Sequence, residues 1–234
     1  ISWETTETSN FGVDMAFCSF VTRNGKPEWE IEFAETVDYS LTWKEKLNNA
    51  PTLSGKGLIQ LDIDYGRYLG QLVCHFLNHC RTKPDLIASH GHTVFHQPDE
   101  GYSYQIGNGN AIAAEVGVPV VCDFRQMDVS LEGQGAPLVP VGDRDLFQEY
   151  DYCLNIGGFA NISFDDKKNR IAFDIVPANI VLNRLSAMSG KSFDMNGDMA
   201  RSGKPIWSII NKLNQLPWYQ KLPPKSLGRE WVEN

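Results

Sequence analysis

The stretch from Asp151 to Asn179 restricts the possible folds of this chain more than any other. It holds three apolar runs: Tyr152–Ile156, Ala160–Phe164 and Ile171–Phe173. Gly157-Gly158 separates the first two runs, and Asp174 follows the third, before the break at Pro177. The pattern predicts three short strands, a glycine turn that admits a close backbone, and a carboxylate at a strand exit, where α/β proteins often place their chemistry. A plain hairpin with a surface Asp fits the stretch equally well.

Charge and composition argue against several classes of protein. The 234 residues carry a formal net charge of −8 and a pI near 5.1, whereas a nucleic-acid-binding protein needs a basic face. Hydrophobic residues make up 42% of the chain, which predicts one large globular domain or two modest ones. No apolar run approaches the length of about 18 residues typical of a membrane span, and no secretory signal is visible. We therefore expect a cytoplasmic protein without nucleic-acid or membrane partners.

The cysteines do not form a disulfide or zinc pattern. There are five, at widely spaced positions without a CxxC pair: Cys18, Cys74, Cys80, Cys122 and Cys153. An odd count inside mostly apolar runs predicts small buried core residues in a reducing compartment.

The first half of the chain predicts a hairpin followed by two helices. Val13–Val21 and Glu28–Val37 have strand patterns, and Asn24-Gly25 between them is a hairpin turn signal. A short helix is expected over Ser40–Asn49 and a long amphipathic one over Leu58–Cys80. His75 and His79 on the long helix have metal-ligand spacing, but no third ligand accompanies them, so we interpret them as surface histidines.

A strand over Asp85–Ser89 leads into three alternating histidines: His90, His92 and His96. Gly91 interrupts the run, and no Cys or Asp lies nearby, which disfavours a metal site. We expect a polar loop whose His and Thr side chains bond a hydroxylated ligand.

The apolar run Val118–Cys122 predicts a strand buried on both faces. It follows a strand that ends at Tyr104–Gly107 and a helix over Asn110–Val116, and it leads into Asp123-Phe124-Arg125. Arg125 could read a ligand carboxylate with its fork of donors, or it could pair with Asp123 inside the protein.

The junction and the second half have weaker signals. Leu138-Val139-Pro140 predicts extended structure, and the polar Gly142–Asp145 a domain boundary. Asn179–Ser189 predicts a helix with apolar side chains facing inward. The N-terminal amides of this helix are expected to form an anion-binding site. Asp194–Asp198 does not match a calcium loop. Pro205–Leu213 predicts a last helix, followed by loop-like structure.

Together these features suggest a phosphotransferase in which two glycine-bearing hairpins, one from each half, hold a nucleotide triphosphate. Six segments then resemble the anhydro-N-acetylmuramic acid kinases: SHGHTVFHQP, QIGNGNAIAAEVGVPVVCDFRQMDV, EGQGAPLVP, LNIGGFANISF, FDIVPAN and KSLGRE. They occur in order through nearly the whole chain.

The resemblance implies a two-domain, actin-like α/β ATPase with a ribonuclease H-like fold. Residues 1–148 would form the first domain and 149–234 the start of an incomplete second one. Such enzymes use ATP, Mg²⁺ and water to open 1,6-anhydro-N-acetylmuramic acid and phosphorylate it at O6. The product is N-acetylmuramic acid 6-phosphate, formed during cytoplasmic peptidoglycan recycling, and the family tends to form homodimers.

Positions in the family motifs imply roles for individual residues. Asp174 matches the general base that activates water. The implied ATP- and phosphate-binding residues are Thr8, Ser9, Gly12, Asp14, Gly157, Gly158 and Asn161. The implied ligands of the sugar and its lactyl carboxylate are His90, Gly91, Thr93, Asp123 and Arg125. No protein metal ligand is predicted.

The chain departs from the family pattern at several positions. The first phosphate loop, GTSxDGxD in the family, has Glu7 for its leading glycine and Phe11 for its first aspartate. DTGPGN reads DIVPAN, HGQT has His92 for Gln, and we expect a chain truncated at its C-terminus. A Glu near phosphates repels them. The alternative to a kinase is therefore a non-catalytic sugar-binding or scaffold relic of the same fold.

Overall fold

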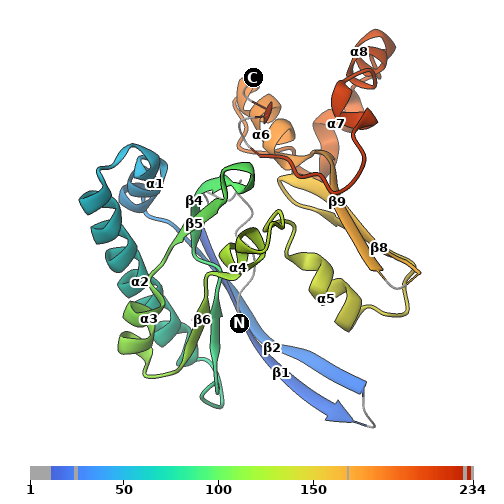
Figure 1. Ribbon diagram of the computed structural model, residues 1–234. Helices are drawn as coiled ribbons and strands as arrows, with labels where there is room; N and C mark the ends of the chain where they lie inside the picture. Colours follow the sequence, from blue (N-terminus) through green and yellow to red (C-terminus); the bar gives the residue numbers. More distant parts are fainter. Residues whose placement is uncertain (1–11, 24–25, 168, 229–230, 233–234) are drawn as a thin grey trace. The chain divides into compact units, whose positions relative to one another are not determined.

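The computed structural model describes residues 12–23, 26–167, 169–228 and 231–232 (Figure 1). The chain has a mixed α/β structure and divides into two compact units, with the boundary between Leu138 and Val139. This division lies ten residues before the boundary expected at 148/149. Within the described residues, no helix combines the length and the apolar character required to cross a membrane.

In the first unit, the described residues form three two-stranded sheets and the helices between them. Its strands are β1 (Gly12–Arg23), β2 (Lys26–Asp38), β3 (Ile87–Ser89), β4 (His92–Gln97), β5 (Tyr102–Ile106) and β6 (Val120–Cys122). Its helices are α1 (Leu41–Asn48), α2 (Gly55–Leu77), α3 (Gly109–Val116) and α4 (Phe124–Ser130), with 3-10 turns η1 (Ala50–Thr52) and η2 (Pro98–Glu100). β1 and β2, like β4 and β5, pair antiparallel, whereas β3 and β6 pair parallel.

The second unit has one antiparallel sheet in the order β7-β8-β9. Its strands are β7 (Tyr152–Ile156), β8 (Phe159–Asp166) and β9 (Asn169–Pro177). Its helices are α5 (Val139–Leu146), α6 (Asn179–Met188), α7 (Asp198–Ser202) and α8 (Trp207–Leu213), with 3-10 turns η3 (Met195–Gly197) and η4 (Pro217–Gln220).

Capping side chains explain where the helices of the first unit begin. Ser40 Oγ accepts a hydrogen bond from the Trp43 amide, and Ser54 Oγ accepts one from the Gly57 amide, so each serine satisfies a free N–H of the first turn. Gly117 ends α3 at a φ of 67°, in the left-handed region that glycine adopts without strain. These features confirm the predicted helices.

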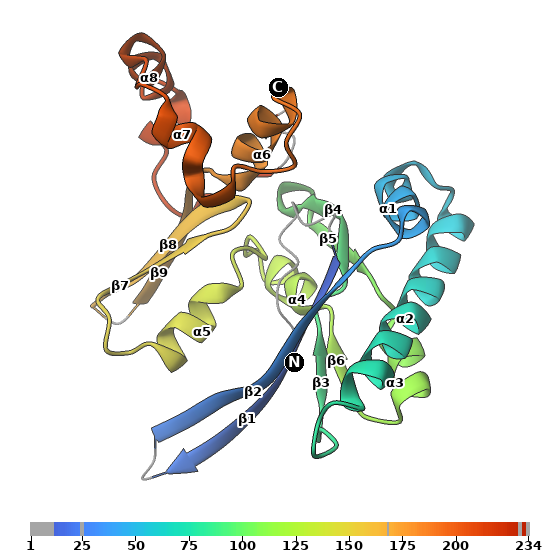
Figure 2. The same ribbon diagram turned by 180° about the vertical axis from the view of Figure 1, so that it is seen from behind.

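The core of the first unit lies between α2 and β1. The inward face of α2, with Leu61, Tyr65, Leu69 and Phe76, is buried, as are alternate residues of β1. α2 and α3 run side by side in both views (Figures 1 and 2). Gly66 permits this approach, because an added Cβ there would lie 2.6 Å from the carbonyl oxygen of Asn108. The loop before α3 is therefore fixed against the long helix.

Several predictions about burial are wrong. None of the five cysteines is buried, and Cys74 and Cys122 are exposed. β6 is not buried on both faces, because Val121 is 48% exposed and Cys122 is exposed as well. On α6 the large apolar side chains also point outward, and the side chain buried there is Ser186: the exposed ones are Leu182, Leu185 and Met188.

Two predictions of local structure are also wrong. Residues 139–146, expected as an extended segment and a polar boundary, form α5, because Pro140 is tolerated in a first helical turn and Asp143 is buried. There Asp143 accepts a hydrogen bond from Ser163 Oγ. The histidine segment, expected as a loop, becomes strand β4 from His92 onward, because β5 lies beside it and pairs with it. The turn predicted at Asn24-Gly25 lies outside the described residues, although β1 and β2 pair as a hairpin requires.

Candidate functional site

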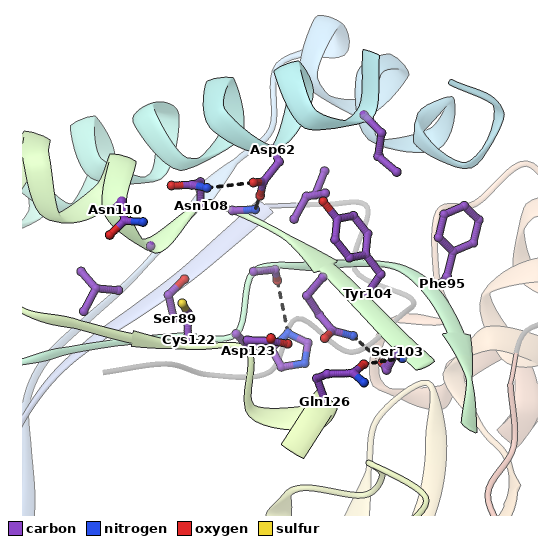
Figure 3. A pocket seen from close by; sticks show the side chains of 18 of the residues that line it. Asp62, Ser89, Phe95, Ser103, Tyr104, Asn108, Asn110, Cys122, Asp123 and Gln126 are labelled. Carbon is purple, nitrogen blue, oxygen red and sulfur yellow. Dashed lines mark hydrogen bonds between the residues drawn. The ribbon is translucent and has the colours of Figure 1, made fainter. Parts of the chain in front are cut away.

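A pocket of about 810 Å³ opens in the first unit, at the ends of its short strands (Figure 3). Three segments form its walls: Ser89–Gly91 at the end of β3, Gly107–Asn110 where β5 leads into α3, and Cys122-Asp123 at the end of β6. Tyr104 and Gln105 of β5 complete the lining. Ligand sites in α/β proteins are commonly built in this way, from loops that follow strand ends.

His90 lies in the pocket wall with its ring held by the protein. Arg125 Nε donates to His90 Nε2 over 3.0 Å, so the ring proton is on Nδ1, which donates to the Gly91 carbonyl over 3.2 Å. Burial, and then the nearby charge of Arg125, lower the pKa of His90 to about 4. At neutral pH this histidine is therefore an uncharged group.

A second series of side-chain hydrogen bonds includes two buried atoms that have no partner among the described residues. Gln105 Nε2 donates to Ser103 Oγ over 2.8 Å, and this hydroxyl lies 3.1 Å from His96 Nδ1. Either tautomer of His96 satisfies this contact, because the hydroxyl can donate to Nδ1 or accept from it. Neither His96 Nε2 nor Gln105 Oε1 has a partner among the residues that the structure describes, although both atoms are buried. Of the two, Gln105 lines the pocket, so its unpaired acceptor lies in the pocket wall, whereas His96 is not a lining residue.

Burial also keeps His92 and His96 uncharged. Loss of solvent lowers the pKa of His92 to about 4, and burial together with the charge of Arg125 does the same for the pKa of His96. Of the three histidines, His90 lines the pocket, where it presents a neutral polar group. Over the described ranges, no three His, Cys, Asp or Glu side chains gather as a metal site.

Asp62 of α2 fixes the opposite wall. Its Oδ1 accepts from the Gly107 amide over 2.8 Å, and its Oδ2 accepts from Asn108 Nδ2 over 3.0 Å (Figure 3). Asn108 Oδ1 in turn accepts from the Ala111 amide, which caps α3. One carboxylate therefore sets both the pocket loop and the start of the helix behind it.

In the second unit, Asp174 lies within β9 and is buried. The strand continues to Pro177, so the prediction that Asp174 sits at a strand exit is wrong. The register shifts beside it: Asn161 lies opposite Asp174, whereas Ala160 lies opposite Val176, so Ile175 is an extra residue. Such bulges redirect a side chain and often accompany functional sites. Asp174 Oδ2 accepts from the Leu227 amide over 2.7 Å.

The glycine pair contacts the start of α6. The Gly158 carbonyl accepts from the amides of Ala178 and Ile180, and the Gly157 carbonyl accepts from the amide of Asn179. The backbone that approaches these glycines thus belongs to the protein itself. The helix N-terminal amides that were predicted to bind an anion donate to these glycine carbonyls instead. In this structure they are therefore not available to an anion.

Comparison with known proteins assigns the family. The family model for anhydro-N-acetylmuramic acid kinase matches residues 8–233. The chain belongs to the anhydro-N-acetylmuramic acid kinase family. This confirms the resemblance carried by the six sequence segments.

Three relatives with this family's name illustrate the match. That of Shewanella putrefaciens is 38% identical over 190 residues, covering 74% of this chain and 52% of the relative. That of Aliivibrio fischeri is 38% identical over 181 residues, covering 73% and 49%. That of Shewanella baltica is 34% identical over 243 residues, covering 97% and 65%. The matched region thus spans about half to two thirds of the length of these kinases.

The residues that the family motif assigns to the sugar separate into two groups. His90, Gly91 and Asp123 line the pocket. Thr93 contacts it through Gln105, whose Nε2 lies 3.5 Å from Thr93 Oγ1. Arg125 is buried behind His90, where its Nη1 donates to the Gly135 carbonyl over 2.7 Å. A role for Arg125 in reading a carboxylate stays a prediction.

The first phosphate loop of the family motif is only partly described. Thr8 and Ser9 lie outside the described residues. An added Cβ at Gly12 would collide with the Val37 carbonyl, so this glycine serves the close pairing of β1 and β2. Asp14 Oδ1 accepts from Thr36 Oγ1 over 2.6 Å. The roles of these residues toward ATP remain predictions.

Sequence reasoning missed several pocket residues: Asp62, Ser103, Gln105 and Asn108. Gln105 and Asn108 lie within the segment QIGNGN, which carried only the family resemblance and no predicted role for either side chain. Asp62 could not be found, because it lies in an ordinary amphipathic helix and its partners are 45 and 46 residues away.

Proposed function

We propose that this chain binds 1,6-anhydro-N-acetylmuramic acid in the pocket of its first unit and takes part in phosphorylating it with ATP. The observation that carries the proposal is the buried acceptor Gln105 Oε1, which lies on a residue of the pocket wall and has no partner among the described residues. Buried polar groups are normally paired, so this acceptor is matched to a ligand that supplies a donor. The hydroxyl and acetamido N–H groups of an amino sugar supply such donors.

Size and charge of the pocket support the same ligand class. Small-molecule sites usually measure about 300–1,000 Å³ and combine aromatic walls with a few polar groups. This pocket holds about 810 Å³ and includes Phe95 and Tyr104 beside its polar atoms. Because His90 in its wall is neutral, this part of the pocket is suited to the hydroxyl and acetamido groups of the sugar.

Asp174 would be the general base of the reaction. Water oxygen would bond to C1 of the sugar as the C1–O6 bond breaks, O6 would take the γ-phosphoryl group, and ADP would leave. Asp174 would accept a proton from the water, a function that requires hydrogen-bond reach. The Leu227 amide supports this proposal, because a donor on Oδ2 favours the charged carboxylate.

The wider assignment follows the family. The product would be N-acetylmuramic acid 6-phosphate, made in the cytoplasm during peptidoglycan recycling, by an enzyme that forms homodimers. The fold would be a two-domain actin-like one. ATP would bring Mg²⁺ to its phosphates. Among the residues assigned to the phosphates, Asp14 and the glycine pair already contact other parts of the chain, so the metal would be held mainly by the nucleotide.

The test is a coupled ADP-release assay with the anhydro sugar, with the product mass measured in parallel. We expect sugar-dependent ADP and a product heavier by one phosphate and one water. Asp174→Asn should lower the turnover about 10²-fold or more, the usual contribution of a general base, with sugar binding unchanged. Sugar binding without any ADP release would instead support the non-catalytic relic, and ADP release unchanged in Asp174→Asn would contradict the role of Asp174.

A further inference from the structure

We propose that Trp218 and Lys225 are positioning residues that hold Asp174 in place, an inference that rests on the proposed role of Asp174 as the base. A closed ring of hydrogen bonds joins them to β9. It runs from the Asp174 amide to the Lys225 carbonyl, from Lys225 Nζ to the Trp218 carbonyl, and from Trp218 Nε1 to the Ile175 carbonyl. Since Ile175 is next to Asp174, the ring returns to its start.

The backbone part of the ring sets the carboxylate directly. The Asp174 amide donates to the Lys225 carbonyl over 3.1 Å, and two residues later the Leu227 amide donates to Asp174 Oδ2 over 2.7 Å. The segment after η4 therefore pairs with Asp174 through both its main chain and its side chain. Any movement of this segment changes the direction of the carboxylate.

The side-chain part of the ring fixes that segment. Lys225 Nζ donates to the Trp218 carbonyl over 3.2 Å and lies 4.8 Å from the Trp218 ring centre and 5.5 Å from that of Phe173. Trp218 Nε1 donates to the Ile175 carbonyl over 2.9 Å. Ile175 is the extra residue of the bulge, so the indole secures the backbone where the strand register shifts.

The burial of Lys225 indicates a specific role. Its residue is only 8% exposed, whereas a lysine in an ordinary loop keeps its charge in water. In the part of the chain that the structure describes, no carboxylate pairs with it; a carbonyl and two aromatic faces take that place. Nearby Leu222 is 82% exposed, so the segment is not buried throughout. The buried contacts concentrate where it meets Asp174.

The test uses variants that keep the shape and remove one contact each. Trp218→Phe removes the indole N–H, and Lys225→Met removes Nζ while keeping the length of the side chain. Trp207→Phe and Lys212→Met, both on the exposed surface of α8, are the matched controls. We expect the first two to lower kcat about tenfold, the loss that corresponds to one hydrogen bond of ordinary strength, with the KM for the sugar within about threefold. The controls should not change kcat.

A double-mutant cycle separates positioning from general stability. In the Asp174→Asn background, Trp218→Phe should cause no further loss of the residual turnover, because it acts through Asp174. Hydrogen exchange of the Leu227 amide should become faster in Trp218→Phe. An unchanged kcat, or an equal further loss in the Asp174→Asn background, would overturn the positioning role alone. A wild-type chain that releases no ADP would overturn the proposed function and this inference with it.

Discussion

His96 is a side chain whose position opposes stability. Its Nε2 atom is buried without a partner among the described residues, and leaving such a group unpaired costs about 1–3 kcal/mol. Its other ring nitrogen lies 3.1 Å from Ser103 Oγ, a contact worth about 1 kcal/mol. The cost of the unpaired atom therefore equals or exceeds the gain from this hydrogen bond.

We therefore predict that His96→Phe stabilises the chain. The free energy of unfolding should rise by about 1 kcal/mol, because the unpaired atom is removed and only one ordinary hydrogen bond is lost. Urea unfolding measures the effect. A variant that is less stable than the wild type would contradict this account of His96.

The neutral histidines predict how stability depends on pH. Burial lowers the pKa of His90, His92 and His96 to about 4 from the ordinary 6.5. Between these values the unfolded chain binds protons that the folded chain does not, so the free energy of unfolding falls as the pH drops from about 6.5 to about 4. Each histidine contributes about 1 kcal/mol per pH unit in this window, all of it retained above pH 6.5.

His92→Gln tests this linkage, since it removes one of the three groups and restores the residue of the family pattern. Urea unfolding between pH 7 and pH 4.5 should give a smaller pH slope in His92→Gln than in the wild type. His75→Gln, on the exposed surface of α2, serves as the control and should keep the full slope. Equal slopes in all three proteins would contradict the pKa assignment of His92.

Among the elements, α2 has the largest influence on the pocket. Its inner face forms the core, Asp62 holds the pocket loop, and Gly66 lets that loop approach. An added Cβ at Gly66 would lie 2.6 Å and 2.9 Å from the backbone oxygen and nitrogen of Asn108. At Gly55, in the same helix, an added Cβ would meet nothing within 4 Å.

These two glycines make a matched pair. Gly66→Ala should destabilise the chain by about 1–3 kcal/mol, because overpacking against a backbone outweighs the gain in helix propensity of about 1 kcal/mol. It should also weaken sugar binding, since Asn108 belongs to the pocket. Gly55→Ala should be neutral within about 0.5 kcal/mol. Urea unfolding compares them, and equal stability of the two variants would refute the close approach of α2 and α3.

The sequence allowed prediction of elements whose signals are local. Ser40 and Gly117 marked helix ends, and the alternation in Glu28–Val37 marked a strand, because caps and periodicity depend on neighbouring residues. β6 was placed correctly, but its exposure was not, since burial of a strand depends on which distant elements pack over the faces of its sheet. α5 was missed because a proline near a helix start looks like a break.

In the candidate site, too, the residues with a local sequence signal were predicted and those that depend on distant partners were not. His90, Gly91 and Asp123 were found because they follow predicted strands. Asp62, and the contact of Leu227 with Asp174, were not found, because the partners are 45 and 53 residues apart. The bulge at Ile175 also has no local signal, as it arises from pairing with β8.

For the whole molecule, the pocket proposed to bind the sugar belongs entirely to the first unit, and Asp174 belongs to the second. Sugar binding and turnover can therefore be altered separately. Variants of pocket residues should change the affinity for the sugar, and variants of Trp218 and Lys225, which hold Asp174, should change the turnover. The chain covers about half to two thirds of the length of the relatives that it matches. A test of sugar binding does not assume that this chain has the activity of those longer proteins.

Calorimetric titration of 1,6-anhydro-N-acetylmuramic acid into the wild-type chain and into Gln105→Leu tests this pocket as the sugar site. Gln60→Leu, on the exposed surface of α2, is the control. We predict one sugar per chain for the wild type and Gln60→Leu, and at least about tenfold weaker binding for Gln105→Leu, because the Oε1 acceptor is lost. No binding to the wild type, or equal binding by Gln105→Leu, would contradict the assignment of the pocket.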